Sequence, residues 1–162
     1  MQVPKNQIGT TLVVALMFLL VATVLGTTAM GTSKMQINMS RNVQQKSVSF
    51  ERAENAREAA EQRVRDLVAS GSSFPGGTQG HYNLSSGGTA PATTTKAFWA
   101  TASNYVAVGS SAGYVIEYLG SKSIVLDDRT SNETMRVYRL TVIGKGSDGA
   151  AETVSQGIYI QN

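Results

Sequence analysis

Cysteine is absent from this sequence, and histidine occurs only once. Without cysteine the chain has no disulfide framework, no zinc–thiolate site and no thiolate nucleophile. The single histidine, His81, lies in a polar segment beside Tyr82 without further metal ligands at useful spacing, so we interpret it as a surface residue. No nucleophile–base pair is visible in the sequence. We therefore predict a protein that is not an enzyme and that uses no cofactor.

Proline is scarce as well, with residues only at positions 4, 75 and 91. Because none lies between Pro4 and Pro75, nothing in that span forces a helix to break. The glycines Gly26 and Gly31 weaken a helix by only about 1 kcal/mol each. The N-terminal part of the chain is therefore free to form one very long helix.

Charge is missing from the whole stretch between Lys5 and Lys34, and most of its centre, residues 12–25, is aliphatic or aromatic. A helix over residues 10–33 would be about 36 Å long, whereas the hydrocarbon core of a bilayer is about 30 Å thick. We predict that residues 10–33 form a membrane-spanning helix.

The helical pattern continues beyond Lys34 in amphipathic form. Apolar residues recur mostly at steps of three and four, which is the spacing of one helix face. They are Met35, Met39, Val43, Phe50, Ala53, Ala56, Ala60, Val64 and Leu67. Gly71 then favours a helix end. We predict one helix from Thr10 to Ser70, with residues 34–70 as its amphipathic half and its small alanines packed closely against a sheet.

Two interpretations of this N-terminus remain. In a secretory signal peptide, Lys5 would supply the basic region and residues 12–25 the apolar region, with cleavage near Thr27–Ala29. In a lasting anchor, the helix would continue beyond the apolar run without a loop. The helical spacing after Lys34 favours the anchor.

Positive charge exceeds negative charge by 3, but the excess is not arranged for nucleic acid. It belongs to Lys5 and to the helix over residues 34–70, whereas basic and acidic residues balance in residues 71–162. A nucleic-acid-binding domain would gather its basic residues on one face of the folded part. We predict a membrane partner and no nucleic-acid partner.

The C-terminal half changes from loop to strand character. Residues 71–97 are rich in glycine, serine and threonine, and we interpret them as a long surface loop. Strand periodicity follows over residues 104–108, 113–119, 135–143 and 150–160. Short connections imply antiparallel pairing, and so small a sheet needs a helix on its apolar face. We predict an α+β fold, in which the long N-terminal helix packs on a small antiparallel β-sheet formed within residues 98–162.

One acidic cluster has two interpretations. Asp127 and Asp128, together with Asn132 and Glu133, offer oxygen ligands of the kind that calcium prefers. A polar hairpin turn explains the same residues equally well. We therefore assign no metal site and leave calcium binding open.

Several segments together resemble a known family. Lys5–Gly9 followed by Thr10–Leu16 is similar to the N-terminus of type IV prepilins, and more narrowly to that of PilX-type minor pilins. The membrane-proximal segment Arg41–Glu54 fits the same group, as do Tyr114–Glu117 and Tyr138–Thr141. The resemblance covers the N-terminal helix and much of the sheet region, and it implies a pilin-like fold.

The resemblance implies a structural role rather than catalysis. It implies that residues 1–9 are a leader, that a prepilin peptidase cuts after Gly9, and that Thr10 becomes the N-methylated terminus. The implied partners are other minor pilins, the major pilin and the inner-membrane pilus assembly platform, with a tip adhesin as a further candidate. The protein would first be a single-pass inner-membrane protein with a cytoplasmic N-terminus and a periplasmic domain. It would then join the pilus fibre at the cell surface, near the tip, where minor pilins prime assembly.

Two residues depart from the usual pilin pattern. Most pilins carry glutamate at the fifth position of the mature chain, which is Val14 here. A lone buried carboxylate is costly, whereas a paired one is not. The absence of glutamate therefore removes an interaction that sets the register between neighbouring subunits. This absence fits a subunit at the leading end. Thr10 stands where phenylalanine is commonest, which leaves methylation open.

Two alternatives remain beside the minor pilin. A pseudopilin of a type II secretion system would share nearly every feature described above. An extracytoplasmic binding domain with an ordinary signal peptide or anchor would differ at its N-terminus. A pilin is cut at Gly9, before the apolar run, whereas a secretory signal is cut after it.

Overall fold

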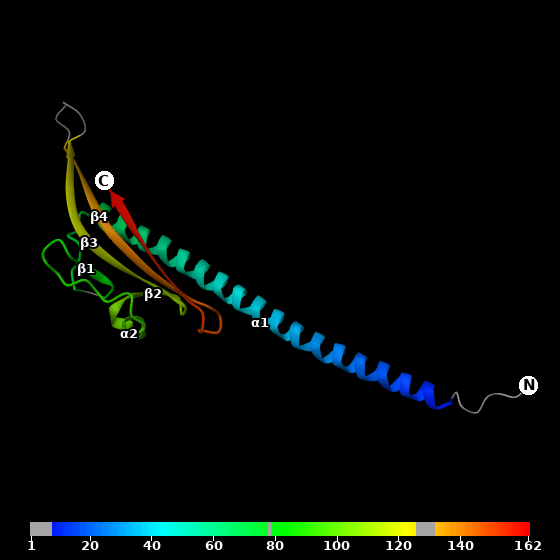
Figure 1. Ribbon diagram of the computed structural model, residues 1–162. Coiled ribbons are helices and arrows are strands. Elements are labelled where there is room, and N and C mark those ends of the chain that lie inside the picture. Colours follow the sequence, from blue (N-terminus) through cyan, green and yellow to red (C-terminus); the bar gives the residue numbers. More distant parts are fainter. Residues whose placement is uncertain (1–7, 78, 126–131) are drawn as a thin grey trace, which may run out of the picture. The chain divides into compact units, whose positions relative to one another are not determined.

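The computed structural model describes residues 8–77, 79–125 and 132–162 of the chain (Figure 1). The chain divides into two compact units, Met1–Val43 and Gln44–Asn162. The first unit holds the N-terminal part of helix α1. The second holds the rest of α1 together with a sheet and its short connecting elements. The α+β fold predicted from the sequence is confirmed.

Helix α1 runs from Ile8 to Ala69, which confirms the predicted helix within one or two residues at each end. By length and composition it could cross a membrane, and its most apolar window has no buried residue. The helix ends where the sequence indicates. Gly71 adopts a φ of 63°, a left-handed value that favours glycine after a helix, and Ser70 N donates to Asp66 O (3.0 Å).

The sheet contains five strands, joined by two short helical elements. The strands are β1 (His81–Asn83), β2 (Val106–Val108), β3 (Ala112–Val125), β4 (Asn132–Lys145) and β5 (Glu152–Gln161). The helical elements are α2 (Lys96–Ala100) and η1 (Ala102–Asn104). The strand order is β1-β3-β4-β5, with β2 also pairing to β3. Figure 1 shows the long strands β3, β4 and β5 curving side by side.

The pairing is antiparallel for β2–β3, β3–β4 and β4–β5, as predicted. The sheet is nevertheless mixed, because β1 pairs with β3 in parallel. Parallel neighbours need a long crossover connection, and the segment with α2, η1 and β2 supplies one. The strand β1 lies inside the segment 71–97 interpreted as loop, where its length of 3 residues is too short to show a period.

One face of the sheet packs against residues 49–67 of α1. The core there is formed by Ala53, Ala56, Ala60, Val64, Tyr114, Ile116, Tyr138, Leu140 and Val142. Hydrophobic burial of this kind supplies most of the stability of a small domain. The predicted packing of the small alanines against a sheet is confirmed, since Ala53, Ala56 and Ala60 are fully buried.

The predicted apolar face of the amphipathic half is wrong at its N-terminal end. Phe50 is exposed, and the neighbouring Ser49 occupies the buried position instead. Ser49 Oγ lies 2.6 Å from Thr153 Oγ1 and donates to Lys46 O (2.8 Å), so its hydroxyl is satisfied in the interface. A small polar residue with local partners fits where helix and sheet come closest.

The opposite face of the sheet is covered over part of its area by the segment containing α2. Phe98 and Trp99 of α2 form a second core with Val115 and Ile143. Trp99 Nε1 donates to Thr93 O (2.7 Å), and Tyr82 Oη donates to Asn104 O (3.1 Å). These bonds satisfy the polar ends of the two rings and fix the cover in place.

Helix α1 approaches the sheet closely at Gly144 of β4. A Cβ atom added to Gly144 would collide with the backbone of Ser49 and Ala53. Gly146, just beyond the strand, leaves only 2.9 Å between such a Cβ and Gln45 Oε1. The backbones of α1 and β4 can approach this closely because Gly144 lies opposite the small residues Ser49 and Ala53.

Gly144→Ala should destabilise the protein by about 1–3 kcal/mol, because helix backbone would have to move to admit the methyl group. Gly157→Ala in β5 is the matched control, since an added Cβ there meets nothing within 4 Å. It should change stability by less than about 1 kcal/mol. Chemical denaturation of the full chain in detergent micelles measures both. Equal unfolding midpoints for the two variants would contradict the close approach.

Candidate functional site

The predicted processing residues lie at the beginning of α1. Gly9 and Thr10 follow Ile8, where the helix begins, and Thr10 is exposed. Residues 1–7 of the predicted leader lie outside the described residues. Cleavage after Gly9 and methylation of Thr10 therefore remain predictions.

The apolar part of α1 carries no unsatisfied hydroxyl among its serine and threonine residues from Thr23 to Ser33. Thr27 Oγ1 donates to Val24 O (2.9 Å), and Thr32 Oγ1 donates to Thr28 O (3.0 Å). Thr23, Thr28 and Ser33 make equivalent bonds to carbonyl groups of the preceding turn. A hydroxyl satisfied within its own helix is tolerated in lipid and in an apolar bundle of helices.

The apolar residues of this segment are exposed on every side. They include Leu12, Val13, Val14, Leu16, Met17, Phe18, Leu19, Leu20, Val21, Val24 and Leu25. A helix that is apolar all round needs lipid or other protein around it. This segment is the strongest candidate for a functional surface in the first unit.

The two strand segments that resemble the pilin family lie opposite each other in the sheet. Ile116 pairs with Leu140, and Glu117 pairs with Arg139. Ile116 and Leu140 belong to the core under α1, whereas Glu117 and Arg139 alternate to the other face. The motifs are therefore two halves of one structural unit.

Glu117 is a buried carboxylate with one charged partner. Its residue is only 1% exposed, and Arg139 Nη1 lies 3.5 Å from its Oε1. The other oxygen, Oε2, has no hydrogen-bond partner among the described residues. Burial raises the pKa of Glu117, and the positive charge of Arg139 opposes that shift. The pair keeps a costly charge buried on this face of the sheet, and the strand pattern of the sequence does not predict that burial.

His81 is buried, so the interpretation as a surface residue is wrong. It is 6% exposed and packs against Phe74, with 5.7 Å between ring centroids. Its Nδ1 lies 2.8 Å from Gln79 O, while Nε2 has no partner among the described residues. Burial lowers the pKa of His81. The pairing of β1 with β3 is the cause, because it aligns His81 with the buried Ile116.

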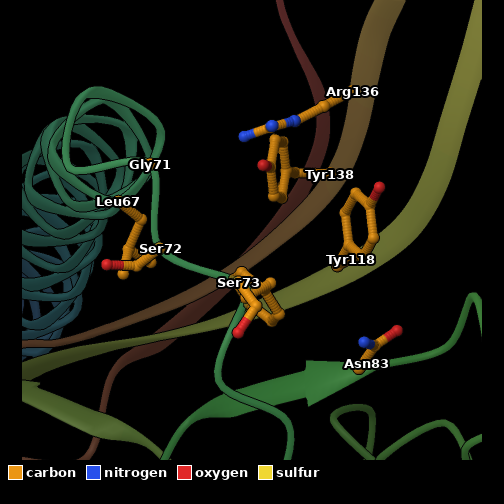
Figure 2. A pocket seen from close by; sticks show the side chains of 9 residues that line it. Leu67, Gly71, Ser72, Ser73, Asn83, Tyr118, Arg136 and Tyr138 are labelled. Atoms are coloured by element: carbon orange, nitrogen blue, oxygen red, sulfur yellow. The ribbon is translucent and has the colours of Figure 1, made fainter.

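A cavity of about 340 Å³ lies beside the C-terminal end of α1 (Figure 2). Its wall is formed by Leu67, Gly71, Ser72, Ser73, Phe74, Asn83, Tyr118, Arg136 and Tyr138. Figure 2 shows Leu67 and Ser72 on the helix side, with Tyr118, Tyr138 and Arg136 on the strand side. Phe74 contacts both tyrosine rings, at centroid distances of 5.7 Å and 5.8 Å. Among the described residues, the lining includes neither a carboxylate nor a histidine.

Metal binding finds no support in the described part of the chain. Among residues 8–77, 79–125 and 132–162, no group of three histidine, aspartate or glutamate side chains could hold an ion. Asp127 and Asp128, the residues considered for calcium, lie outside the described residues. Calcium binding at that hairpin is therefore still untested.

Comparison with known families supports the resemblance. A family model described as PilX N-terminal matches residues 9–56. The matched segment begins at Gly9 and includes the apolar part of α1 and the first buried alanines of the second unit. The match confirms the resemblance to a PilX-type pilin. No curated protein and no solved structure matches the chain.

Glu117→Gln should change how stability depends on pH. The folded chain holds the Glu117 proton more tightly than the unfolded chain, whose pKa is near 4.5. The contribution of Glu117 is therefore fully present below pH 4.5 and is lost as the pH rises through the higher folded pKa. Gln has no proton to lose, so the variant should gain stability relative to wild type as the pH rises from about 4.5 through the folded pKa of Glu117.

Urea denaturation across that pH range measures this difference. Glu58→Gln, at an exposed position on α1, is the matched control and should shift stability by less than about 0.5 kcal/mol at any pH. A constant offset between Glu117→Gln and wild type would contradict the buried carboxylate.

Proposed function

From the PilX-type N-terminal segment, residues 9–56, we propose that this chain is a minor pilin that helps to prime assembly of a type IV pilus and lies near the fibre tip. The observation that carries the proposal is the continuity of α1 through both units. Its first part is apolar all round, and its last part is packed on a sheet. The first part of α1 can enter a membrane or a bundle of helices, while the last part belongs to a folded domain.

The N-terminal processing is part of the proposal. A prepilin peptidase removes the leader, residues 1–9, and methylates the new amine of Thr10. The match to the family model begins at Gly9, the last residue of that leader, which supports this position. Residues 10–33 then anchor the protein in the inner membrane, and the domain that follows lies in the periplasm.

Assembly transfers α1 from lipid to a bundle of pilin helices. The transfer costs little hydrophobic free energy, because both surroundings are apolar. The hydroxyl groups of residues 23–33 need no new partners, because they already bond within the helix. Other minor pilins, the major pilin and the inner-membrane assembly platform are the proposed partners.

The residue Val14 supports a position at the leading end. A carboxylate at that position would pair with the N-terminal amine of the subunit ahead, and an unpaired one would be costly in an apolar bundle. Val14 is exposed in the isolated chain and carries no charge. A subunit with nothing ahead of it has no amine to pair with, so valine is the suitable residue.

Deletion of the gene should sharply reduce the number of surface pili, because priming precedes elongation. Re-expression of the wild-type chain should restore them. Immunogold labelling of restored fibres should place the protein at one end of each fibre. Normal piliation without the protein, or its absence from sheared fibres, would contradict the proposal.

Val14→Glu should move the protein away from the tip. A carboxylate there can pair with a neighbouring amine, so the variant should be incorporated along the fibre, and more copies should appear per fibre length. Val14→Gln, of similar size but uncharged, should not show this redistribution. Quantitative labelling of fibres carrying each variant measures the change. An unchanged tip position for Val14→Glu would refute this role of Val14.

A further inference from the structure

The sheet continues beyond the C-terminal end of α1, and the cavity of Figure 2 lies at that end. Helix α1 ends at Ala69, and Leu67 of its last turn lines the cavity together with Tyr138 of β4. Strand β4 itself begins farther out, at Asn132, and β3 continues to Val125. The helix therefore stops before the sheet does, and this face of the sheet has a hollow where the helical cover ends.

Three aromatic rings form the apolar part of the cavity. Tyr118 and Tyr138 are cross-strand neighbours whose ring centroids lie 5.3 Å apart, and Phe74 contacts both rings. All three residues line the cavity. Aromatic rings at such distances favour further stacked or edge-to-face contacts with another ring. This part of the wall therefore fits a ligand that carries an aromatic ring.

Arg136 is the only charged residue among the described residues that line the cavity. Figure 2 shows its guanidinium group against the hydroxyl of Tyr138. This contact opposes the rise in the Tyr138 pKa that burial causes. Arg136 forms no ion pair with a carboxylate among the side chains that the structure describes. A guanidinium group has five N–H donors in a planar fork, so most of them remain available to a ligand.

Asn83 of β1 adds a second donor to the lining. Its Oδ1 accepts hydrogen bonds from Ser85 N (3.1 Å) and from Ser85 Oγ (2.7 Å), which fixes the orientation of the amide. The Nδ2 group of Asn83 has no hydrogen-bond partner among the described residues. The polar part of the lining therefore offers donors, and a ligand that fits it must supply acceptors.

The end of α1 does not counteract these donors. The C-terminal end of a helix carries a partial negative charge, because its last carbonyl groups are unpaired. Here Leu67 O accepts a bond from Ser70 Oγ (2.9 Å), and Val68 O accepts one from Gly71 N (3.1 Å). These carbonyl groups are already occupied, so the charge of Arg136 dominates the cavity.

We propose that this cavity binds a carboxylate that is attached to an aromatic ring. The carboxylate pairs with Arg136 and accepts a further bond from Asn83 Nδ2, while the ring contacts the three aromatic side chains. A single guanidinium group matches the single charge of a carboxylate, whereas a phosphate group carries a charge of about −1.5 to −2.

The size of the cavity limits the ligand. Its volume of about 340 Å³ lies near the lower end of the range for ligand sites, roughly 300–1,000 Å³. One ring and its carboxylate fit this space, whereas a folded segment does not. Two sources share this chemistry, namely a free aromatic acid and the last residue of a polypeptide that ends in an aromatic side chain.

Titration of the full chain in non-ionic detergent micelles, followed by NMR of its backbone amides, tests the proposal. The probes are 3-phenylpropionate and the peptide acetyl-Gly-Ser-Phe with a free carboxylate, and each is compared with its uncharged amide form. Both acids should shift the signals of Ser72 and Asn83 until they saturate. The amides should bind at least about tenfold more weakly, because they lose the charge-assisted bonds to arginine.

The two acids distinguish the sources of the ligand. A peptide that binds at least about tenfold more tightly than 3-phenylpropionate identifies a polypeptide C-terminus as the ligand, because contacts of the preceding residues then add to the affinity. A smaller difference identifies a small aromatic acid. Either result supports the site.

A pair of variants tests the role of the guanidinium group. Arg136→Gln should weaken binding of both acids at least about tenfold. Arg41→Gln is the matched control, because it removes one positive charge at an exposed position of the first unit, and its affinity should stay within about twofold. Arg136→Lys keeps the charge but loses the planar fork, so its affinity should lie between those of wild type and Arg136→Gln.

Three results would overturn the site. They are equal binding of the acids and their amides, equal losses in Arg136→Gln and Arg41→Gln, and saturable shifts confined to residues outside the cavity. The comparison of acids with amides uses the wild-type chain, so it decides the question even if Arg136→Gln fails to fold. The cavity lies wholly within the second unit, so these outcomes are independent of the proposed role as a minor pilin.

Discussion

The structure depends on the close contact between the last part of α1 and one face of the sheet. Small side chains on the helix and a glycine on β4 let the two backbones approach closely. The large side chains of the strands, such as Tyr138 and Leu140, then close over the helix. Without this contact the sheet would have no cover on its most apolar face, and the helix would lose the domain it carries. Dispersion and hydrophobic burial at this density are sensitive to a single methyl group.

The other face of the sheet is only partly covered, and it contains a buried ion pair. A short cover with two aromatic residues buries part of it. The side chain of Glu117, on the same face, is buried as well. A buried ion pair is weak evidence for stability, because the desolvation of both charges opposes their attraction. The pairing of Glu117 with Arg139 does connect two neighbouring strands in register, and the same strands carry the segments that resemble pilins. Beyond the cover, the face is left apolar and open along β5.

Helices and strands could be predicted from the sequence wherever the periodic spacing of apolar residues persists over many residues. The helix, its alanine row and the three long strands all have such periods, and the N-terminal segment carries a family pattern. Features set by tertiary contact could not be predicted. The parallel strand β1 has 3 residues and no period, so neither it nor the burial of His81 was expected. Phe50 has the right spacing for the buried face, but the smaller neighbouring residue Ser49 is buried instead. The cavity beside Arg136 depends on segments that only the fold brings together.

A pilin is defined by what happens at its N-terminus, since processing before the apolar run leaves the helix intact for membrane and fibre. The most direct measurement is the N-terminal residue of the mature protein, obtained by mass spectrometry of the purified membrane or fibre fraction. A terminus at Thr10, with or without a methyl group, is the expected result. A terminus near Met30 would mean an exported protein without the apolar helix, and an uncut Met1 in cells with active peptidase would mean a plain membrane anchor. Either of these would contradict the proposed role as a minor pilin.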